Sequence, residues 1–435
     1  MKKLLPLLIV SLFSVNADYK IDEFFLKNGL RTIMIEKKSV PIISCSIWYR
    51  CGSRCDALFK SGCAHFLEHL AFLNHKQKFS NYLEDIGAEK NAFTAINTIC
   101  FYEIFPKDCL EKVLFFESER MRSLEIEDKV FQNEKKTILE ERGRSIDSDI
   151  QGKYEEVFLS NIFNRQIGGI SVIGWKHEIE SIEIEDLKAY YKTWIVPNNA
   201  TIILVGDFDE EVIKSLIKKY FEDIPSTKLS EKNYSPKKID GRKSITCQST
   251  KTGSLSTIKY TYKVPFLYRD NLRKATALAL ALEILEQPAF FINGILTQMT
   301  DTVSSYGFLY NALFYEYDIL NVTFSMHKID NLDKVEESWS YFRKKIINGC
   351  INENELQKIK KRKLIALAYK KEDVEKISNY FGWNLVCGFS LEDVLSMDDL
   401  IQSITVKECN DVLKEVFSTS PISVMKTLPK GYDRD

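Results

Sequence analysis

The pattern of apolar and polar positions divides the chain into strand-like and helix-like stretches. Residues 24–53, FFLKNGLRTIMIEKKSVPIISCSIWYRCGS, alternate in polarity and are rich in β-branched side chains. Because Asn28-Gly29 is typical of a tight turn, this stretch predicts a β-hairpin followed by another strand. Residues from about 60 to 86 have helical spacing instead, and Gly87 is expected to end that helical region.

Further along the chain, strands and helices follow one another in blocks. Residues 91–105, NAFTAINTICFYEIF, are again rich in strand formers, residues from about 106 to 164 are largely helical in pattern, and residues 198–208, NNATIILVGDF, form another apolar strand. This order predicts an α+β fold rather than a doubly wound parallel sheet.

A faint internal repeat links the two halves of the sequence. SIEIEDLKAYYKTWIVPNNATIILV from Ser181 and SITVKECNDVLKEVFSTSPISVMKT from Ser403 share an apolar rhythm, with Ile202 matching Val424 at an offset of 222 residues. Such self-similarity indicates a duplicated domain. The polar stretch at 225–244 is the best candidate for a linker. We therefore expect a first domain at 18–225, a linker at 226–245 and a second domain at 246–435.

The N-terminus has the pattern of a bacterial secretory signal peptide. Met1-Lys2-Lys3 is basic, Leu4 to Val15 is mainly apolar, and small residues at the end of this run offer a cleavage site after residue 17. The apolar run is shorter than the roughly 20 residues that span a bilayer. These features predict a periplasmic or secreted protein without an integral membrane span, and an uncleaved anchor is the main alternative.

The charge balance and the cysteine count exclude some classes of protein but name no function. Lys and Arg total 60 against 61 Asp and Glu, so no basic excess points to nucleic acid as a partner. The ten cysteines are sparse for a chain of 435 residues. Local bridges between Cys51 and Cys55 or between Cys45 and Cys63 are possible, but buried free thiols are the preferred interpretation.

The strongest chemical signal is His65-Phe66-Leu67-Glu68-His69. On a helix, positions 65, 68 and 69 lie on one face. Two neutral imidazoles one turn apart can bind a single Zn²⁺, and a carboxylate beside them can accept a proton from the attacking water. The spacing therefore predicts a zinc site, with satisfied structural histidines as the alternative.

A third protein ligand is sought in DKVFQNEKKTILEERGRS, which carries Glu134, Glu140 and Glu141. At about 100° per residue, Glu141 lies about 60° from the apolar Ile138, whereas Glu140 lies about 160° away. We therefore expect Glu141 to face the interior and Glu140 to face water. Glu140 remains the competitor if the helical phase slips by one residue, and His75 is a weaker third-ligand candidate.

These motifs, followed by YYKTWIVPNNATIILVGDFD, resemble the pitrilysin or insulinase family of zinc metallopeptidases, and by length its processing-peptidase branch. The resemblance implies two similar α+β domains, each a mostly antiparallel sheet packed with helices. It implies that His65, His69 and Glu141 bind one zinc ion and that Glu68 activates water. It further implies that Glu134 contributes to catalysis by contacting the zinc ligands rather than the zinc ion. It implies a structural or substrate-side role for Asn91.

One departure from the family pattern bears on possible partners. Members often carry an arginine and a tyrosine in the second domain that help to hold the peptide carbonyl. The corresponding segment here, ILTQMTDTVSSYGFLY, lacks the arginine and has Asp301 where the tyrosine is expected, with Tyr306 and Tyr310 nearby. We therefore expect a dimer, by preference a heterodimer whose partner supplies the Arg/Tyr pair. A homodimer and a non-catalytic scaffold subunit are the alternatives.

Overall fold

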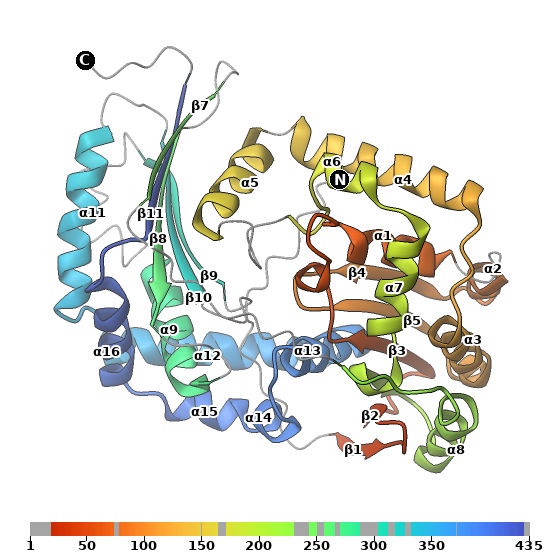
Figure 1. The fold of residues 1–435 in the computed structure, drawn as a ribbon. Helices are drawn as coiled ribbons and strands as arrows, with labels where there is room; N and C mark the ends of the chain where they lie inside the picture. The colour runs from red at the N-terminus through yellow and green to blue at the C-terminus, as the bar shows by residue number, and fades with distance from the viewer. Residues whose placement is uncertain are drawn as a thin grey trace.

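The computed structural model describes residues 19–73, 78–148, 150–163, 171–229, 243–249, 256–265, 270–287, 303–311, 318–326, 332–370 and 372–429. Its strands form two sheets that lie in the two halves of the chain (Figure 1). The α+β prediction is therefore confirmed. The N-terminal segment, His75, Asp301 and His327 lie outside the described residues.

The first sheet has six strands, in the order β1-β2-β6-β3-β5-β4. Only the β2–β6 pair is parallel, and the other neighbours are antiparallel. The expected hairpin at Asn28-Gly29 joins β1 to β2 through residues 26–30, where Gly29 has a φ of 86°. The strands are β1 (Lys20–Phe25), β2 (Arg31–Glu36), β3 (Ile42–Tyr49), β4 (Glu89–Thr94), β5 (Ile99–Pro106) and β6 (Ala200–Gly206).

The second sheet has five described strands, in the order β7-β11-β8-β10-β9. Its β7–β11 pair is parallel and the other neighbours are antiparallel, so it repeats the topology of β2-β6-β3-β5-β4. The strands are β7 (Lys243–Ser249), β8 (Ser256–Val264), β9 (Val303–Asn311), β10 (Asp318–Met326) and β11 (Ser423–Pro429). The repeat read from the sequence thus corresponds to two sheets of the same connectivity.

Helices of the first half pack mainly around the first sheet. They are α1 (Cys63–Phe72), α2 (Lys78–Asp85), α3 (Leu110–Arg122), α4 (Asp128–Arg142), α5 (Ile150–Phe163), α6 (Lys176–Ser181), α7 (Ile184–Trp194) and α8 (Glu210–Phe221). The helical region predicted at 60–86 contains α1 and α2, and Gly87, with a φ of 67°, follows the end of α2 as expected. A π-helical turn at Gly143–Asp147 separates α4 from α5.

The described helices of the second half are α9 (Leu272–Leu285), α11 (Leu332–Ile347), α12 (Glu353–Lys370), α13 (Val374–Val386), α14 (Leu391–Leu395), α15 (Met397–Ser403) and α16 (Val406–Phe417). The sequence repeat aligns α7 and β6 with α16 and β11, because Ile184 at the start of α7 matches Val406 at the start of α16 at the offset of 222. The repeated element is therefore a helix followed by the sheet strand next to β2 or β7.

Each half contributes one helix that packs on the sheet of the other half, and we call these two helices, α5 and α13, the exchanged helices. Helix α13 of the second half packs on β3 and β6, where Trp48 meets Trp383 at 5.3 Å between ring centroids. Helix α5 of the first half packs on the second sheet, where Phe158 contacts a cluster containing Ile319 and Met425. Figure 1 shows α13 beside β3 and α5 leaning toward the second sheet. Each sheet thus has one face covered in part by the other half.

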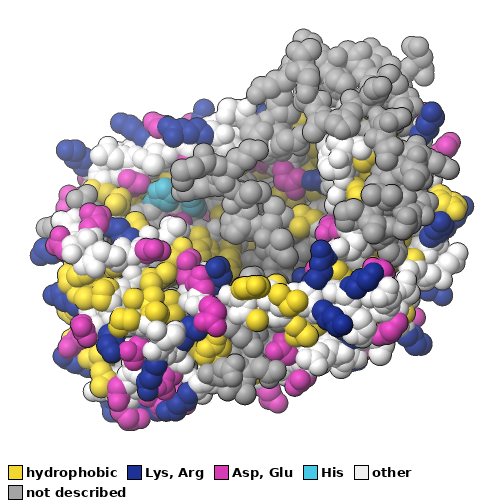
Figure 2. All heavy atoms as spheres, turned by 180° about the vertical axis from the view of Figure 1, so that it is seen from behind, with side chains coloured by type: hydrophobic (Ala, Val, Ile, Leu, Met, Phe, Trp, Pro, Cys, Tyr) yellow, Lys and Arg dark blue, Asp and Glu magenta, His cyan; other side chains and the backbone are white. Residues whose placement is uncertain are grey.

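The structure also bears on the cysteines, on membrane-spanning helices and on the surface charge. Cys45, Cys51, Cys55 and Cys63 are buried and form no disulfide, so the local bridges that the sequence left open are not formed and the preferred interpretation is confirmed. No helix of the described residues is long and apolar enough to cross a membrane. On the face seen in Figure 2, acidic and basic side chains are intermixed over both halves.

Candidate metal centre

Helix α1 places three polar side chains beside an apolar face. Phe66, Leu67 and Leu70 are buried, whereas His65, Glu68 and His69 are partly exposed. The helix starts at Cys63 after Gly62, whose φ of 94° is easily adopted by glycine. The carboxylate of Asp56 accepts hydrogen bonds from the backbone N–H groups of Gly62 and Ala64, both at 2.8 Å. This satisfies donors at the start of the helix and fixes its direction.

Helix α4 crosses α1 and brings the glutamates to the histidines. The rings of Phe66 and Phe131 stack at 5.0 Å with an interplanar angle of 4°, which fixes the contact between the two helices. The carboxylate Oε2 of Glu141 then lies 3.8 Å from His65 Nε2 and 3.6 Å from His69 Nε2. Donor atoms of the three residues all lie within 4.8 Å of one another. The structure therefore brings His65, His69 and Glu141 together.

Glu141 differs from the sequence prediction in its exposure. Its side chain is 46% exposed, so it does not face the apolar interior as the helical phase suggested. The alternative Glu140 is 69% exposed and pairs with Arg144, one turn along α4. Glu141 points at the histidines because this part of α4 passes over α1 at the protein surface. The expectation that Glu141 faces the interior is therefore wrong.

Glu134 of helix α4 contacts His69, one of the two histidines of the donor set. Its Oε2 is 3.1 Å from His69 Nδ1, a contact that orients the imidazole so that Nε2 faces Glu141. His65 has no equivalent contact, because its buried Nδ1 lacks a hydrogen-bond partner among the described residues.

The two imidazoles have opposite shifts in pKa. Burial, together with the neighbouring His69, lowers the pKa of His65 to about 4. Burial also acts to lower the pKa of His69, but Glu141, Glu68 and Glu134 outweigh it and raise that pKa above its usual value. His65 is therefore neutral at physiological pH, which is the state that a metal ligand needs.

Strand β4 contacts Glu68 of helix α1 and carries Asn91. The Thr94 hydroxyl donates a hydrogen bond of 3.1 Å to Glu68 Oε2, so β4 lies directly beside the histidine helix. Asn91 is exposed on the same strand, and its Oδ1 accepts from the backbone N–H of Ala92. Successive strand side chains alternate between faces, so Asn91 and Thr94 point to opposite sides of the sheet. The structure thus brings Glu68, but not the Asn91 side chain, to the donor set.

Sequence reasoning missed two residues next to this cluster. Thr94 is the fourth residue of the strand segment 91–94, NAFT. Because strand side chains alternate, its spacing from Asn91 would have placed the two side chains on opposite faces of the sheet. Arg142 is four residues beyond the buried Ile138, so helical spacing puts it on the buried side of α4. His177, by contrast, is a surface side chain.

The family's Arg/Tyr segment is only partly described. Phe308 and Tyr310 are buried in strand β9, and the Tyr310 hydroxyl donates a hydrogen bond of 2.6 Å to Asp318. The Tyr306 hydroxyl donates to the backbone carbonyl of Glu286 at 3.2 Å. The described part of the aromatic run therefore belongs to the sheet and its core.

A two-domain α+β fold with an H-x-x-E-H helix and a glutamate from a second helix defines a metallopeptidase-like protein. Two family models match the chain: "Insulinase (Peptidase family M16)" over residues 31–174 and "Peptidase M16 inactive domain" over residues 181–363. The chain belongs to the insulinase family, peptidase family M16.

Individual relatives agree with this family. A zinc protease PqqE of Helicobacter pylori is 28% identical over 53% of this chain and 54% of its own length. A mitochondrial-processing peptidase β subunit of Lentinula edodes is 27% identical over 46% of this chain and 44% of its own length. The chain thus spans about half the length of these curated relatives. The β subunit of Caenorhabditis elegans, 22% identical, is matched over 92% of this chain and 87% of its own length.

Solved structures share the fold of this chain. A protease from Helicobacter pylori has a TM-score of 0.81 at 22% identity, covering 95% of this chain and 100% of that one. The periplasmic protease PqqL of Escherichia coli has a TM-score of 0.77 at 18% identity, covering 95% of this chain and 48% of that one. At these identities the likeness shows the fold alone.

Proposed function

We propose that the chain is an exported zinc endopeptidase that hydrolyses peptides or unfolded polypeptides. The observation that carries this proposal is the convergence of His65, His69 and Glu141 from two helices, with Glu68 on the same helix face as the histidines. Membership of a peptidase family supports the same reading.

The donor set suits zinc. Two imidazole nitrogens and one carboxylate oxygen form a known catalytic ligand set, and ligands about 2 Å from a tetrahedral zinc lie about 3.4 Å apart. Glu141 already lies 3.6 Å and 3.8 Å from the two imidazole nitrogens. When bound, zinc would supply a Lewis acid that polarises the peptide carbonyl and acidifies water.

The chain's own acid and base chemistry would fall to Glu68. Its carboxylate lies on the same helix face as the ligands and is held by the Thr94 hydroxyl at 3.1 Å. Glu68 would accept a proton from the attacking water and pass it to the leaving amine. Glu134 would keep His69 oriented and would not touch the substrate, so it is a positioning residue.

The substrate would bind along strand β4. This strand ends the described order of the first sheet, and an edge strand can pair with an extended peptide through main-chain hydrogen bonds. A peptide on this edge would pass close to Glu68, because Thr94 links β4 to that carboxylate. Asn91 is exposed on β4, where its side chain would contact the bound peptide.

The test compares three isosteric glutamate variants. Glu68→Gln should retain about one zinc per chain and lower peptide hydrolysis by about 10²-fold to 10⁴-fold, as expected for loss of a general base. Glu141→Gln should lose zinc, and Glu140→Gln, the exposed neighbour, should keep both zinc and activity. Full activity of Glu68→Gln would refute the mechanism, and zinc loss in Glu140→Gln alone would refute the ligand assignment.

The partner and the compartment belong to this proposal as well. The processing-peptidase relatives are β subunits by name, and the segment expected to supply the Arg/Tyr pair lacks the arginine. We expect a dimer, by preference with a related chain, whose addition raises peptidase activity at constant zinc content. An inert mixture with every related chain of the same organism would favour the scaffold alternative. Fractionation of cells that express the full chain tests the predicted periplasmic or secreted location.

A further inference from the structure

Arg142 is a buried cation directly next to Glu141. It is 4% exposed, and Glu156 of helix α5, its main partner, is 7% exposed. The two guanidinium nitrogens donate to the two carboxylate oxygens of Glu156, each at 2.8 Å. Asp147 lies 3.3 Å away in addition. A bidentate pair of this kind fixes direction as well as distance.

Arg142 also reaches the segment that supports the start of helix α1. Its guanidinium donates a hydrogen bond of 2.5 Å to the backbone carbonyl of Gly174. Gly174 is pressed against Ser61, because a Cβ atom there would lie 2.3 Å from the Ser61 carbonyl oxygen. The backbone N–H of Trp175 donates to the Ser61 hydroxyl at 2.9 Å. One side chain thus connects the end of α4 to the start of the helix that carries His65.

Helix α5 is the fixed side of this connection. Its Phe158 and Ile162 are buried in a cluster with Ile319 and Met425 of the second sheet. Between Arg142 and α5, the π-helical turn Gly143–Asp147 interrupts the regular α-helical ladder. The Arg142–Glu156 pair closes the chain across this interruption. The position of Glu141, half exposed at the end of α4, is therefore tied to the interface between the two halves.

We propose that Arg142, through Glu156 and the Gly174 carbonyl, is a positioning residue that holds Glu141 at its distance from His65 and His69. This inference rests on the proposed function, since it concerns how one metal ligand is held. It adds that the zinc affinity of the first half depends on a helix that the second sheet supports.

The experiment titrates the metal-free full-length chain with Zn²⁺ against a chromophoric chelator. Variants are Arg142→Met, Arg142→Lys and Glu156→Gln, and the matched control is Arg144→Met, the exposed arginine two residues on. Outer residues of this kind typically change metal affinity by about 10-fold to 100-fold. We expect a loss of that size for Arg142→Met, a smaller loss for Arg142→Lys and Glu156→Gln, and no change for Arg144→Met. Circular dichroism establishes that each variant is folded.

A second readout separates positioning from general destabilisation. At saturating Co²⁺, the visible absorption of Arg142→Met should differ from that of the wild-type chain because Glu141 is displaced, whereas Arg144→Met should reproduce the wild-type spectrum. If Arg142→Met does not fold, Glu156→Gln carries the test. Folded variants with wild-type zinc affinity and cobalt spectrum would overturn the inference. A wild-type chain that binds no zinc would instead overturn the proposed function.

Discussion

At the scale of single residues, the site depends on hydrogen bonds that orient its carboxylates and imidazoles. Glu134 holds His69 through Nδ1, and Thr94 holds Glu68 through its hydroxyl. Neither contact is between sequence neighbours, since Glu134 and Thr94 come from α4 and β4. An oriented base is worth more than a mobile one, because catalysis requires the proton acceptor to be in place when the bond forms.

Thr94→Val removes the hydroxyl and keeps the β-branched shape. A hydrogen bond to a charged group contributes about 1.5–3 kcal/mol, and part of that orients the Glu68 carboxylate. We expect kcat to fall by about ten-fold, with zinc content and KM little changed, as measured by steady-state peptide hydrolysis. Thr193→Val, at a partly exposed position of α7, is the control. An equal fall in both variants, or a fall in zinc content, would contradict this role of Thr94.

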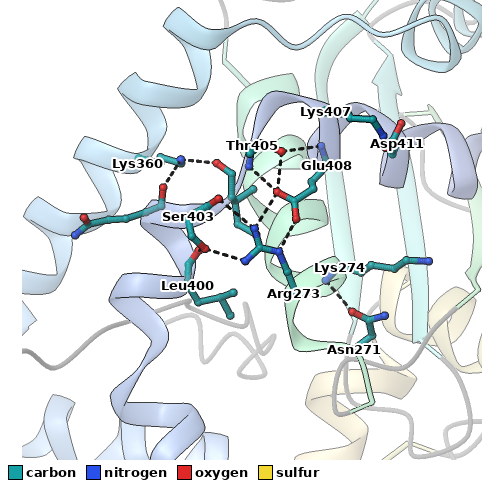
Figure 3. A network of polar contacts seen from close by, with 12 residues as sticks. Asn271, Arg273, Lys274, Lys360, Leu400, Ser403, Thr405, Lys407, Glu408 and Asp411 are labelled. Carbon is teal, nitrogen blue, oxygen red and sulfur yellow. Dashed lines mark hydrogen bonds and ion pairs between the residues drawn. The ribbon is translucent and has the colours of Figure 1, made fainter.

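At the scale of elements, the sequence repeat extends to the way in which its helices begin. Helix α7 starts with a capping box formed by Glu183 and Asp186, and α16 starts with one formed by Thr405 and Glu408, at the same offset of 222. Figure 3 shows how the second cap is tied to Arg273, which donates to Glu408 and to the Ser403 carbonyl. Lys360 of helix α12 is buried, and its ammonium group donates a hydrogen bond of 2.7 Å to the Gln402 carbonyl.

Glu408→Gln tests this cap through its dependence on pH. The Arg273 guanidinium lowers the pKa of Glu408 to about 2. A carboxyl group with a depressed pKa stabilises the fold above its unfolded pKa, near 4.3, and loses that effect as the pH falls toward 2. We expect the variant to be less stable than the wild type in urea unfolding at pH 7, and the difference to shrink below about pH 4.

Glu415→Gln is the control on the same helix, where the carboxylate pairs with Lys274 at the surface. An exposed pair of this kind contributes little. A loss for Glu408→Gln that is the same at pH 7 and at pH 3 would show that the charge of Glu408 is not the cause.

At the scale of the whole molecule, the exchanged helices make the two halves interdependent. Helix α13 brings Trp383 against Phe93 of β4, with ring centroids 5.1 Å apart, and Ser378 against Ser46 of β3 at 2.7 Å. The strand proposed to bind substrate is therefore packed against the second half. The domain boundaries expected from the sequence stay a prediction, and side chains from both sides of the expected linker share one core.

Gly382→Ala tests the packing of α13 on the first sheet. A Cβ atom at Gly382 would lie 1.9 Å from the indole ring of Trp48, which is fully buried. Overpacking of this kind costs about 1–3 kcal/mol, against about 1 kcal/mol gained in helix propensity. We expect a lower midpoint of denaturant unfolding. Gly307→Ala, whose Cβ would make an ordinary contact of 3.7 Å, is the matched control and should change stability less.

The sequence by itself determined features that local geometry dictates. The spacing of His65, Glu68 and His69 places them on one helix face whatever surrounds the helix, because helical periodicity fixes neighbours three and four residues apart. Gly87 follows the end of α2 for a similarly local reason, since its positive φ suits glycine. The repeat at an offset of 222 indicated a duplicated domain, and the structure shows two sheets with the same connectivity.

Only the tertiary structure decided how these elements meet. Helical phase favoured Glu141 over Glu140 by predicting that Glu141 faces the interior, but Glu141 is half exposed, because exposure depends on how α4 crosses α1. The contacts of Thr94 with Glu68, of Arg142 with Glu156, and of Trp48 with Trp383 join elements that are distant along the chain. Such distances follow from the packing of whole faces, and no local sequence pattern encodes them.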